Sequence, residues 1–158
     1  GGRALRGPRH QRRLRHPGRG WGGQGQRAGP LAGGRPFTLN RAVEVRAHAR
    51  PLYSSGKHGD TPRLQSSLGP VLARHRVDVV FQGHDHLYER TKPIEGVVYV
   101  TAGTGGMKLS RVRKSGPWSE TVRSAYGVVL VELDGERLRL RMIESSGRTA
   151  DDWTLAKP

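Results

Sequence analysis

The hydrophobic pattern of a folded domain begins only near residue 43 of this 158-residue chain. Residues 1–40 contain few large apolar side chains and show neither the helical period of 3.6 residues nor the strand period of two. Such a segment cannot bury enough apolar surface to offset the entropy that is lost on ordering. The sequence therefore predicts a disordered segment over residues 1–42 and one domain over residues 43–158.

The net charge of +15 is concentrated in the same first segment. Residues 1–40 hold nine arginines and no lysine or acidic residue, whereas all 13 acidic residues follow them. Three interpretations stay open: an arginine/glycine-rich arm that binds nucleic acid through its charge, a linker with no function of its own, and GC-rich coding sequence translated out of frame. The abrupt start of the patterned sequence favours the third.

The chain contains no cysteine, which excludes disulfide scaffolds, thiolate metal sites and cysteine nucleophiles. No apolar run approaches the roughly 20 residues of a membrane span. No signal peptide opens the sequence. We therefore expect no membrane partner.

The apolar residues after residue 43 predict first a strand and then a helix. Val43–Val45 is a short candidate strand. Gly69-Pro70 predicts a kink or a restart within the helix that follows. The residues that share one face of this helix are Leu64, Leu68, Val71 and Leu72.

The remaining pattern is typical of strands. Near-continuous apolar runs at 77–81 and 97–101 predict strands that are covered on both faces. A third strand is expected over 126–133, followed by a tight turn at Asp134-Gly135. The return strand alternates strictly, with arginines on its solvent face, and its core residues are Leu138, Leu140 and Met142. This mixed α/β order has too little helix to cover a sheet on both faces, so the chain is expected to be part of a larger fold.

Two histidines follow the strand at 77–81 directly, in the sequence Gly83-His84-Asp85-His86. Ligand sites in α/β sheets gather at the carboxyl ends of strands. Two imidazoles two residues apart can point to one side of an extended segment and serve two metal ions about 3.5–4 Å apart. Because His-x-His in a polar loop is more often plain surface, the flanking residues decide the interpretation.

Tyr88-Glu89-Arg90 is expected to continue the same loop, and it adds groups that suit phosphate chemistry. Arg90 either fixes the geometry of the loop, if it is buried, or clamps a phosphate bidentately, if it is exposed. It is the candidate substrate-binding residue. Some thirty residues upstream of the histidine pair, His58 stands in a loop of serine and glycine, where an exposed imidazole can donate a proton near pH 6.

Arg50–Gly59, Gly83–Thr91 and the Pro93-Ile94-x-Gly96 that follows resemble the carboxyl half of the calcineurin-like metallophosphoesterases, in particular the purple acid phosphatases and their bacterial relatives. The resemblance covers about residues 50–155. It implies an α/β fold that is the carboxyl half of an αββα sandwich, with a mixed sheet ending in a β-hairpin. Residues 43–158 are then a partial metallophosphoesterase domain with purple acid phosphatase-type carboxyl-terminal strands.

The same resemblance assigns the site residues. It implies that His84 and His86 each bind one ion of a dinuclear centre containing Fe with Zn, Mn or Fe. It places His58 outside the metal shell, in contact with the phosphate or the leaving group. The family has a further histidine ligand at the position of Ala49, and His48, one residue earlier, is the candidate for that role.

The family's upstream Asp-x-His, Gly-Asp and Gly-Asn-His-Glu motifs have no counterpart, and residues 1–47 contain no aspartate. We therefore expect a carboxyl-terminal fragment or frameshifted product of an enzyme that hydrolyses phosphate esters. The alternatives are a nucleic-acid-binding module that uses the arginine-rich segment, and a non-catalytic remnant. Related enzymes are often exported, but the resemblance sets neither the location, the metals nor the oligomeric state of this chain.

Overall fold

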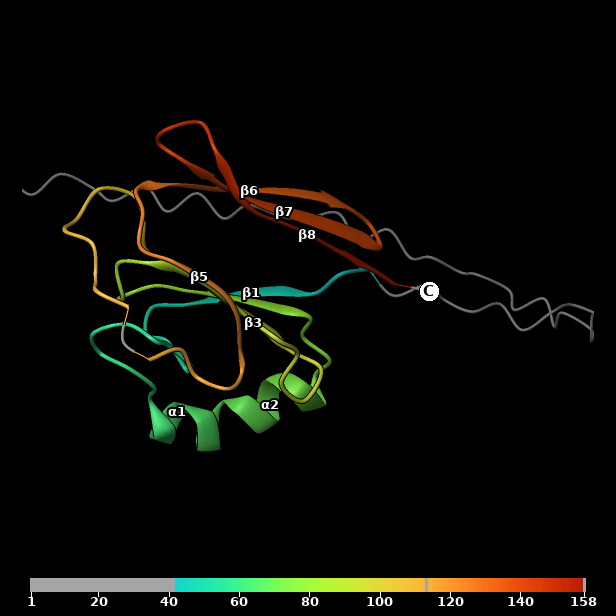
Figure 1. Cartoon of the computed structure of the whole chain (residues 1–158). Helices are drawn as coiled ribbons and strands as arrows, with labels where there is room; N and C mark the ends of the chain where they lie inside the picture. The colour runs from blue at the N-terminus through green and yellow to red at the C-terminus, as the bar shows by residue number, and fades with distance from the viewer. Residues whose placement is uncertain (1–41, 113, 158) are drawn as a thin grey trace, which may run out of the picture. The chain divides into compact units, whose positions relative to one another are not determined.

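The structure, a computed structural model, describes residues 42–112 and 114–157. Figure 1 shows two short helices below a five-stranded sheet and a three-stranded sheet above it. The segment predicted to be disordered, and with it the three interpretations of its arginines, lies outside the described residues except for Ala42.

The two helices are α1, Pro62–Ser67, and α2, Gly69–Arg74. Their separation at Leu68 confirms the predicted restart, because Pro70 occupies the first turn of α2, where the N–H that proline lacks would have no partner within the helix. Leu72 is buried beneath the five-stranded sheet, with Leu64 and Leu68 packed beside it. Neither of these helices is long and apolar enough to cross a membrane, and the described residues contain no other candidate.

The five-stranded sheet has the order β1-β2-β4-β3-β5. Its strands are β1 Val45–His48, β2 Val79–Gln82, β3 Tyr88–Thr91, β4 Val98–Ala102 and β5 Ser119–Arg123. β1, β2 and β4 are parallel, whereas β3 runs antiparallel to both β4 and β5. The carboxyl ends of the three parallel strands therefore meet at one edge. β1, β2 and β4 confirm three predicted strands, with their ends displaced by one to three residues.

Two strands of this sheet differ from the sequence-based expectation. The segment Tyr88–Arg90 was expected to continue a loop, but it belongs to β3, whose four residues are all buried. The polar side chains of β3 bond to partners that are distant in the sequence, as Glu89 bonds to Ser55. Such partners cannot be recognised from the local sequence pattern. β5 was also missed, because Ser119–Arg123 has no apolar alternation.

The three-stranded sheet has the order β6-β7-β8. Its strands are β6 Gly127–Asp134, β7 Arg137–Glu144 and β8 Thr149–Ala156. In β7 the predicted alternation is confirmed, since Leu138, Leu140 and Met142 are fully buried. The hairpin turn is Gly135-Glu136, one residue later than predicted, because Asp134 already pairs with Arg137.

The first and last described segments of the chain both bond to this hairpin turn, beside the hydrophobic core that joins the two sheets. Val43 belongs to this core, and its N–H donates to the carbonyl of Gly135 at 2.8 Å. The N–H of Lys157 donates to the carbonyl of Glu136 at 3.0 Å. The first and last described segments therefore meet at one hairpin. The other buried members of the core are Val79, Tyr88, Val98, Val100, Leu138, Leu140 and Met142.

Candidate active site

Four histidines gather where the parallel strands end, and we call them the histidine edge: His48, His58, His84 and His86. His48 is the last residue of β1 and pairs in register with Gln82, the last residue of β2. His84 and His86 follow β2 in the loop that crosses to β3. The histidine edge therefore lies where the carboxyl ends of the parallel strands meet. The position of the His-x-His sequence, directly after an apolar strand, predicts a ligand site there.

The loop that carries His58 is fixed by buried polar side chains from β2 and β3. The Oε1 atom of Gln82 accepts the N–H of Leu52 at 2.8 Å, and its Nε2 donates to the carbonyl of Tyr53 at 2.7 Å. Glu89, which is 1% exposed, accepts both the N–H and the hydroxyl of Ser55, at 2.7 and 2.6 Å. These bonds satisfy loop groups that would otherwise be buried without partners.

Asp85, which lies between His84 and His86 in the sequence, also binds the loop that carries His58. Its carboxylate is fully buried. One oxygen accepts the hydroxyl of Ser54 at 2.6 Å, and the other accepts the backbone N–H of His58 at 3.0 Å. Bonds to an ionised carboxylate are stronger than bonds between neutral groups. Asp85 therefore ties the position of His58 to that of the His84–His86 segment.

Two glycines make room for Asp85. A Cβ atom on Gly56 would overlap the Asp85 carboxyl group, and a Cβ atom on Gly103 would overlap its carbonyl oxygen. Gly103 directly follows β4, so the crossing loop passes over the end of this strand at backbone distance. Only glycine permits such an approach without a shift of the backbone.

His58 and His84 are in ring contact. Their ring centroids lie 4.1 Å apart with an interplanar angle of 37°. Both residues are exposed, and the backbone φ of His84 is +74°, in the left-handed region that side chains other than glycine rarely adopt. Backbone strain of this kind clusters at functional sites, where the surrounding structure holds it. The structure thus brings together two residues that are 26 positions apart in the sequence.

His86 is oriented by the loop between β4 and β5. Its Nδ1 lies 3.0 Å from the carbonyl oxygen of Lys108, which can only accept, so Nδ1 carries the proton. Its backbone N–H donates to the hydroxyl of Ser110 at 3.1 Å. The Nε2 atom is then left with its lone pair, which is the arrangement that a metal-ligating histidine uses.

His48 also has its Nδ1 in contact with backbone groups. Its Nδ1 lies 2.8 Å from the carbonyl oxygen and 3.2 Å from the N–H of Arg50. The half-buried ring therefore has only Nε2 to offer to a ligand.

The donor chemistry of the histidine edge fits metal ions, but its number of donors is small. Imidazole nitrogen suits zinc, iron and related transition metals. Within residues 42–112 and 114–157, no three histidine, aspartate or glutamate side chains come together as a ready-made metal site. The carboxylate nearest in sequence, Asp85, is committed to Ser54 and His58. A dinuclear centre at this edge therefore needs ligands beyond those of the described residues.

Arg90 lies away from the histidine edge. Its guanidinium makes two hydrogen bonds to Asp151 of β8, from Nε at 2.8 Å and Nη2 at 3.1 Å, and it lies 5.2 Å from the ring centre of Trp153. Both side chains of the ion pair are about nine-tenths buried. Arg90 therefore fixes the contact between the two sheets, which is the buried alternative that the sequence left open, and its donors are not directed to a phosphate.

The residues that the sequence did not identify are Gln82, Asp85 and Glu89. For Gln82 and Asp85 the available signal was their position, at the end of a strongly apolar strand and just beyond it. Polar groups placed there must find internal partners.

Comparisons with known proteins agree with the fold. No family model matches the sequence. The chain is 39% identical over 90 residues to purple acid phosphatase 21 of Arabidopsis thaliana, a match covering 49% of this chain and 21% of the relative. It is 26% identical over 118 residues to purple acid phosphatase 4 of the same plant, covering 73% of this chain and 34% of the relative.

The fold is similar to that of a solved purple acid phosphatase, PPD1 from yellow lupin (Lupinus luteus) seeds. The TM-score is 0.66 with 26% sequence identity, and the match covers 72% of this chain and 25% of the lupin chain. By sequence and by fold, the chain corresponds to the carboxyl-terminal part of a metallophosphoesterase. Within that class it is purple acid phosphatase-like, and it spans between a fifth and about a third of the length of these three relatives.

Proposed function

We propose that this chain supplies the carboxyl-terminal part of a metal-dependent enzyme that hydrolyses phosphate esters. The observation that carries the proposal is the ring contact between His58 and His84 at the carboxyl edge of the parallel strands. His86, two residues beyond His84, is oriented with a free Nε2. The names of the similar proteins, purple acid phosphatases, support the same reaction class.

The proposed roles follow from these positions. His84 and His86 each hold one ion of a dinuclear centre of Fe with Zn, Mn or Fe, and His48 is the candidate for a third histidine ligand through Nε2. When bound, such a pair of ions polarises the phosphate and lowers the pKa of a bound water. The remaining ligands come from outside the described residues.

His58 is proposed as the general acid. Its side chain is exposed and carries no hydrogen bond among the described residues, so the imidazole is free to face a substrate oxygen. The backbone bond to Asp85 fixes the start of this side chain while leaving both ring nitrogens available. A protonated imidazole there donates to the leaving oxygen as the phosphate ester bond breaks.

The test joins this chain to the upstream part of a relative such as the lupin phosphatase. The joined protein is expected to hydrolyse an aryl phosphate. Replacing His58 by alanine is expected to lower kcat by about 10²–10⁴ while the metal content stays constant, because a general acid is removed and no ligand is lost. His84→Ala is expected to reduce the bound metal.

His75→Ala is the matched control, because His75 is an exposed histidine at the carboxyl end of α2. It is expected to change neither kcat nor metal content. Loss of metal in the His58→Ala protein would show that His58 is a ligand and would overturn its proposed role. A joined protein that folds, holds metal and does not hydrolyse the ester would overturn the function itself.

A further inference from the structure

A basic cleft opens beside the histidine edge. Its volume is about 700 Å³, and it reaches from His58 and His86 to the loop between β4 and β5. None of the eight residues that line it is acidic: Lys57, His58, His86, Lys108, Leu109, Ser110, Arg111 and Val112. We call this the basic cleft. Three permanent cations therefore surround a space that adjoins the proposed general acid.

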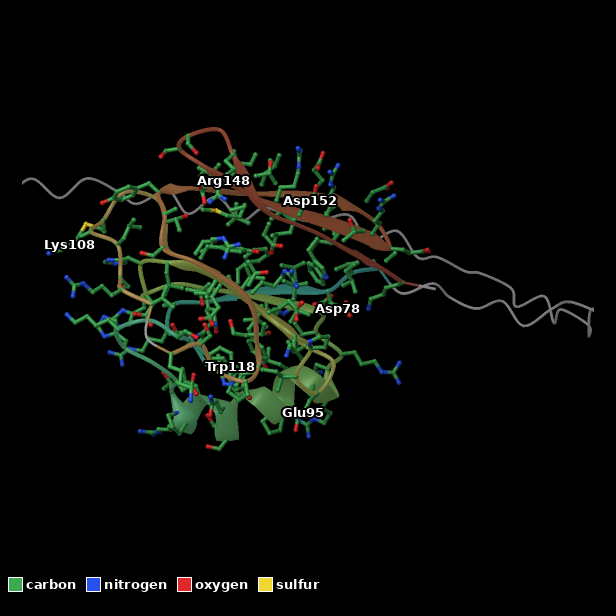
Figure 2. The ribbon with its side chains drawn as sticks, viewed as in Figure 1. Asp78, Glu95, Lys108, Trp118, Arg148 and Asp152 are labelled. Carbon is green, nitrogen blue, oxygen red and sulfur yellow. The ribbon has the colours of Figure 1, made fainter. Side chains whose placement is uncertain are left out.

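The loop segment 108–110, which lines part of the basic cleft, is hydrogen-bonded to His86. The carbonyl oxygen of Lys108 accepts from the His86 ring, and Ser110 exchanges two hydrogen bonds with the His86 backbone, at 3.1 and 2.8 Å. The hydroxyl of Ser124, near the end of β5, donates to the carbonyl of Ser110 at 2.8 Å. Figure 2 shows Lys108 on this loop, at the end of the molecule opposite Asp78.

Asp60, close to Lys57 in the sequence, and Asp85, beside His86, are hydrogen-bonded to groups other than the cleft cations. Asp85 is fully buried, and both of its oxygens are bonded to the loop that carries Lys57. The carboxylate of Asp60 accepts the backbone N–H of Ser54. No ion pair is found for Lys57, Lys108 or Arg111 among the described residues. Their charges are therefore available to an anionic ligand.

We propose that the basic cleft binds a second phosphate group of the substrate, so that the preferred substrates are phosphate esters that carry another phosphate near the one hydrolysed. The inference rests on the proposed function and extends the same site. The ester phosphate lies at the histidine edge, where His58 and the metal ligands meet it. A single phosphate there leaves Lys108 and Arg111 without an anion, whereas a second phosphate in the cleft that they line with His58 and His86 would meet both charges. Arginine and lysine are the side chains that recognise phosphate oxygens.

The test compares inorganic pyrophosphate with inorganic phosphate as probes of the metal-free chain. Each is titrated at low ionic strength while the amide NMR signals of the protein are followed. Pyrophosphate is expected to bind at least about fivefold more tightly than phosphate, because it can form further ion pairs of the exposed kind. The largest shifts are expected at Lys57, His86 and residues 108–112. Raising the salt concentration is expected to weaken both affinities.

Single substitutions then locate the site. Lys108→Gln and Arg111→Gln are each expected to weaken pyrophosphate binding about two- to fivefold and to leave phosphate binding less affected. The matched control is Arg74→Gln, which removes one exposed cation from α2, a helix with no residue lining the cleft. It is expected to change neither affinity.

Equal affinities for the two probes, or an Arg74→Gln effect as large as that of Lys108→Gln, would overturn the proposal. The readout is binding to the chain itself, so it does not depend on turnover. A joined protein that fails to hydrolyse an aryl phosphate overturns the proposed function, whereas equal binding of phosphate and pyrophosphate overturns only this inference.

Discussion

Asp85 shows how one side chain can join two parts of a site. It lies between His84 and His86, yet its carboxylate turns inward and holds the backbone of His58 and the hydroxyl of Ser54. Any shift of the His84–His86 segment is therefore passed to His58 through a buried carboxylate. The geometry of the proposed general acid depends on a residue that touches neither substrate nor metal.

Replacing Asp85 by asparagine tests this connection. One acceptor oxygen becomes an NH₂ group, which cannot accept from Ser54 or from the His58 N–H, so a buried donor loses its partner. The expected loss of unfolding free energy is about 1–3 kcal/mol. The His58 amide signal is expected to shift and to exchange faster with solvent.

Asp60→Asn is the control for this prediction, since Asp60 is exposed and uses one oxygen to accept the N–H of Ser54. Its effect on stability and on the His58 signal is expected to be smaller. If Asp85→Asn leaves both unchanged, Asp85 does not position His58.

At the scale of elements, the sequence predicted the strands that carry an apolar pattern, which is near-continuous in β2 and β4 and alternating in β7. β7 alternates leucine or methionine with arginine, and this alternation alone assigns its buried face. β3 could not be predicted, because Tyr88–Thr91 is buried on both faces with polar side chains. Glu89 and Arg90 point to Ser55 and Asp151, partners separated by 34 and 61 positions.

In the candidate site, too, some residues could be located from the sequence pattern, whereas others depend on contacts between distant parts of the chain. The His84–His86 pair could be located from its place after an apolar strand, and family resemblance singled out His58. The contact between His58 and His84 depends on loop attachments made by Gln82, Asp85 and Glu89. These attachments are tertiary hydrogen bonds, which leave no periodic signal in a single sequence.

The two sheets are joined by Arg90 of β3 and Asp151 of β8, and Tyr88 also donates to Asp151 at 2.6 Å. Burial raises the pKa of Asp151, but the hydrogen bonds from Arg90 and Tyr88 and the charge of Arg90 outweigh it, so the pKa lies below its usual value. A carboxyl group whose pKa is lowered by folding stabilises the protein above its unfolded pKa of about 4. This stabilisation is lost as the pH falls through the lower pKa of the folded state.

Asp151→Asn is expected to lower the unfolding free energy by about 2 kcal/mol near pH 7, because the Arg90 charge is left unpaired. The value is below that of a fully buried pair, since about a tenth of each side chain is exposed. Urea unfolding measured from pH 7 to pH 2 checks it. The difference between variant and parent is expected to narrow below about pH 4.

Asp152→Asn provides the comparison on the same strand, because Asp152 forms an exposed pair with Arg139. A much smaller effect is expected there. Equal effects of the two substitutions would contradict the view that the Arg90–Asp151 pair holds the sheets together.

At the scale of the whole molecule, apolar surface remains uncovered along β6. This strand is at the edge of its sheet, and Val128 and Leu133 are 63% and 56% exposed. Beside it, an apolar groove of about 370 Å³ is lined by side chains that include Phe81, Val129 and Val131. Free edges and apolar patches of this kind promote association.

The chain by itself is expected to bind metal weakly and not to hydrolyse phosphate esters at a rate typical of its relatives. The two histidines proposed as ligands, His84 and His86, would supply only one donor to each of two sites, and without bridging carboxylates two nearby divalent ions repel each other. The measurement is metal content after dialysis with Zn, Fe or Mn, together with an aryl phosphate assay from acid to neutral pH. Tight binding of two ions with turnover that is lost in His84→Ala would contradict it.

The hairpin that receives both Val43 and Lys157 has a topological consequence. Because these residues bond to the adjacent residues Gly135 and Glu136, the folded backbone from 43 to 157 is nearly a closed ring. A short glycine-serine linker between them permits circular permutation, with new termini opened in the exposed turn at 145–148 between β7 and β8. It also permits insertion into one surface loop of a host protein. Neither rearrangement cuts a loop of the histidine edge. The edge can therefore be moved intact into a permuted chain or into a host protein.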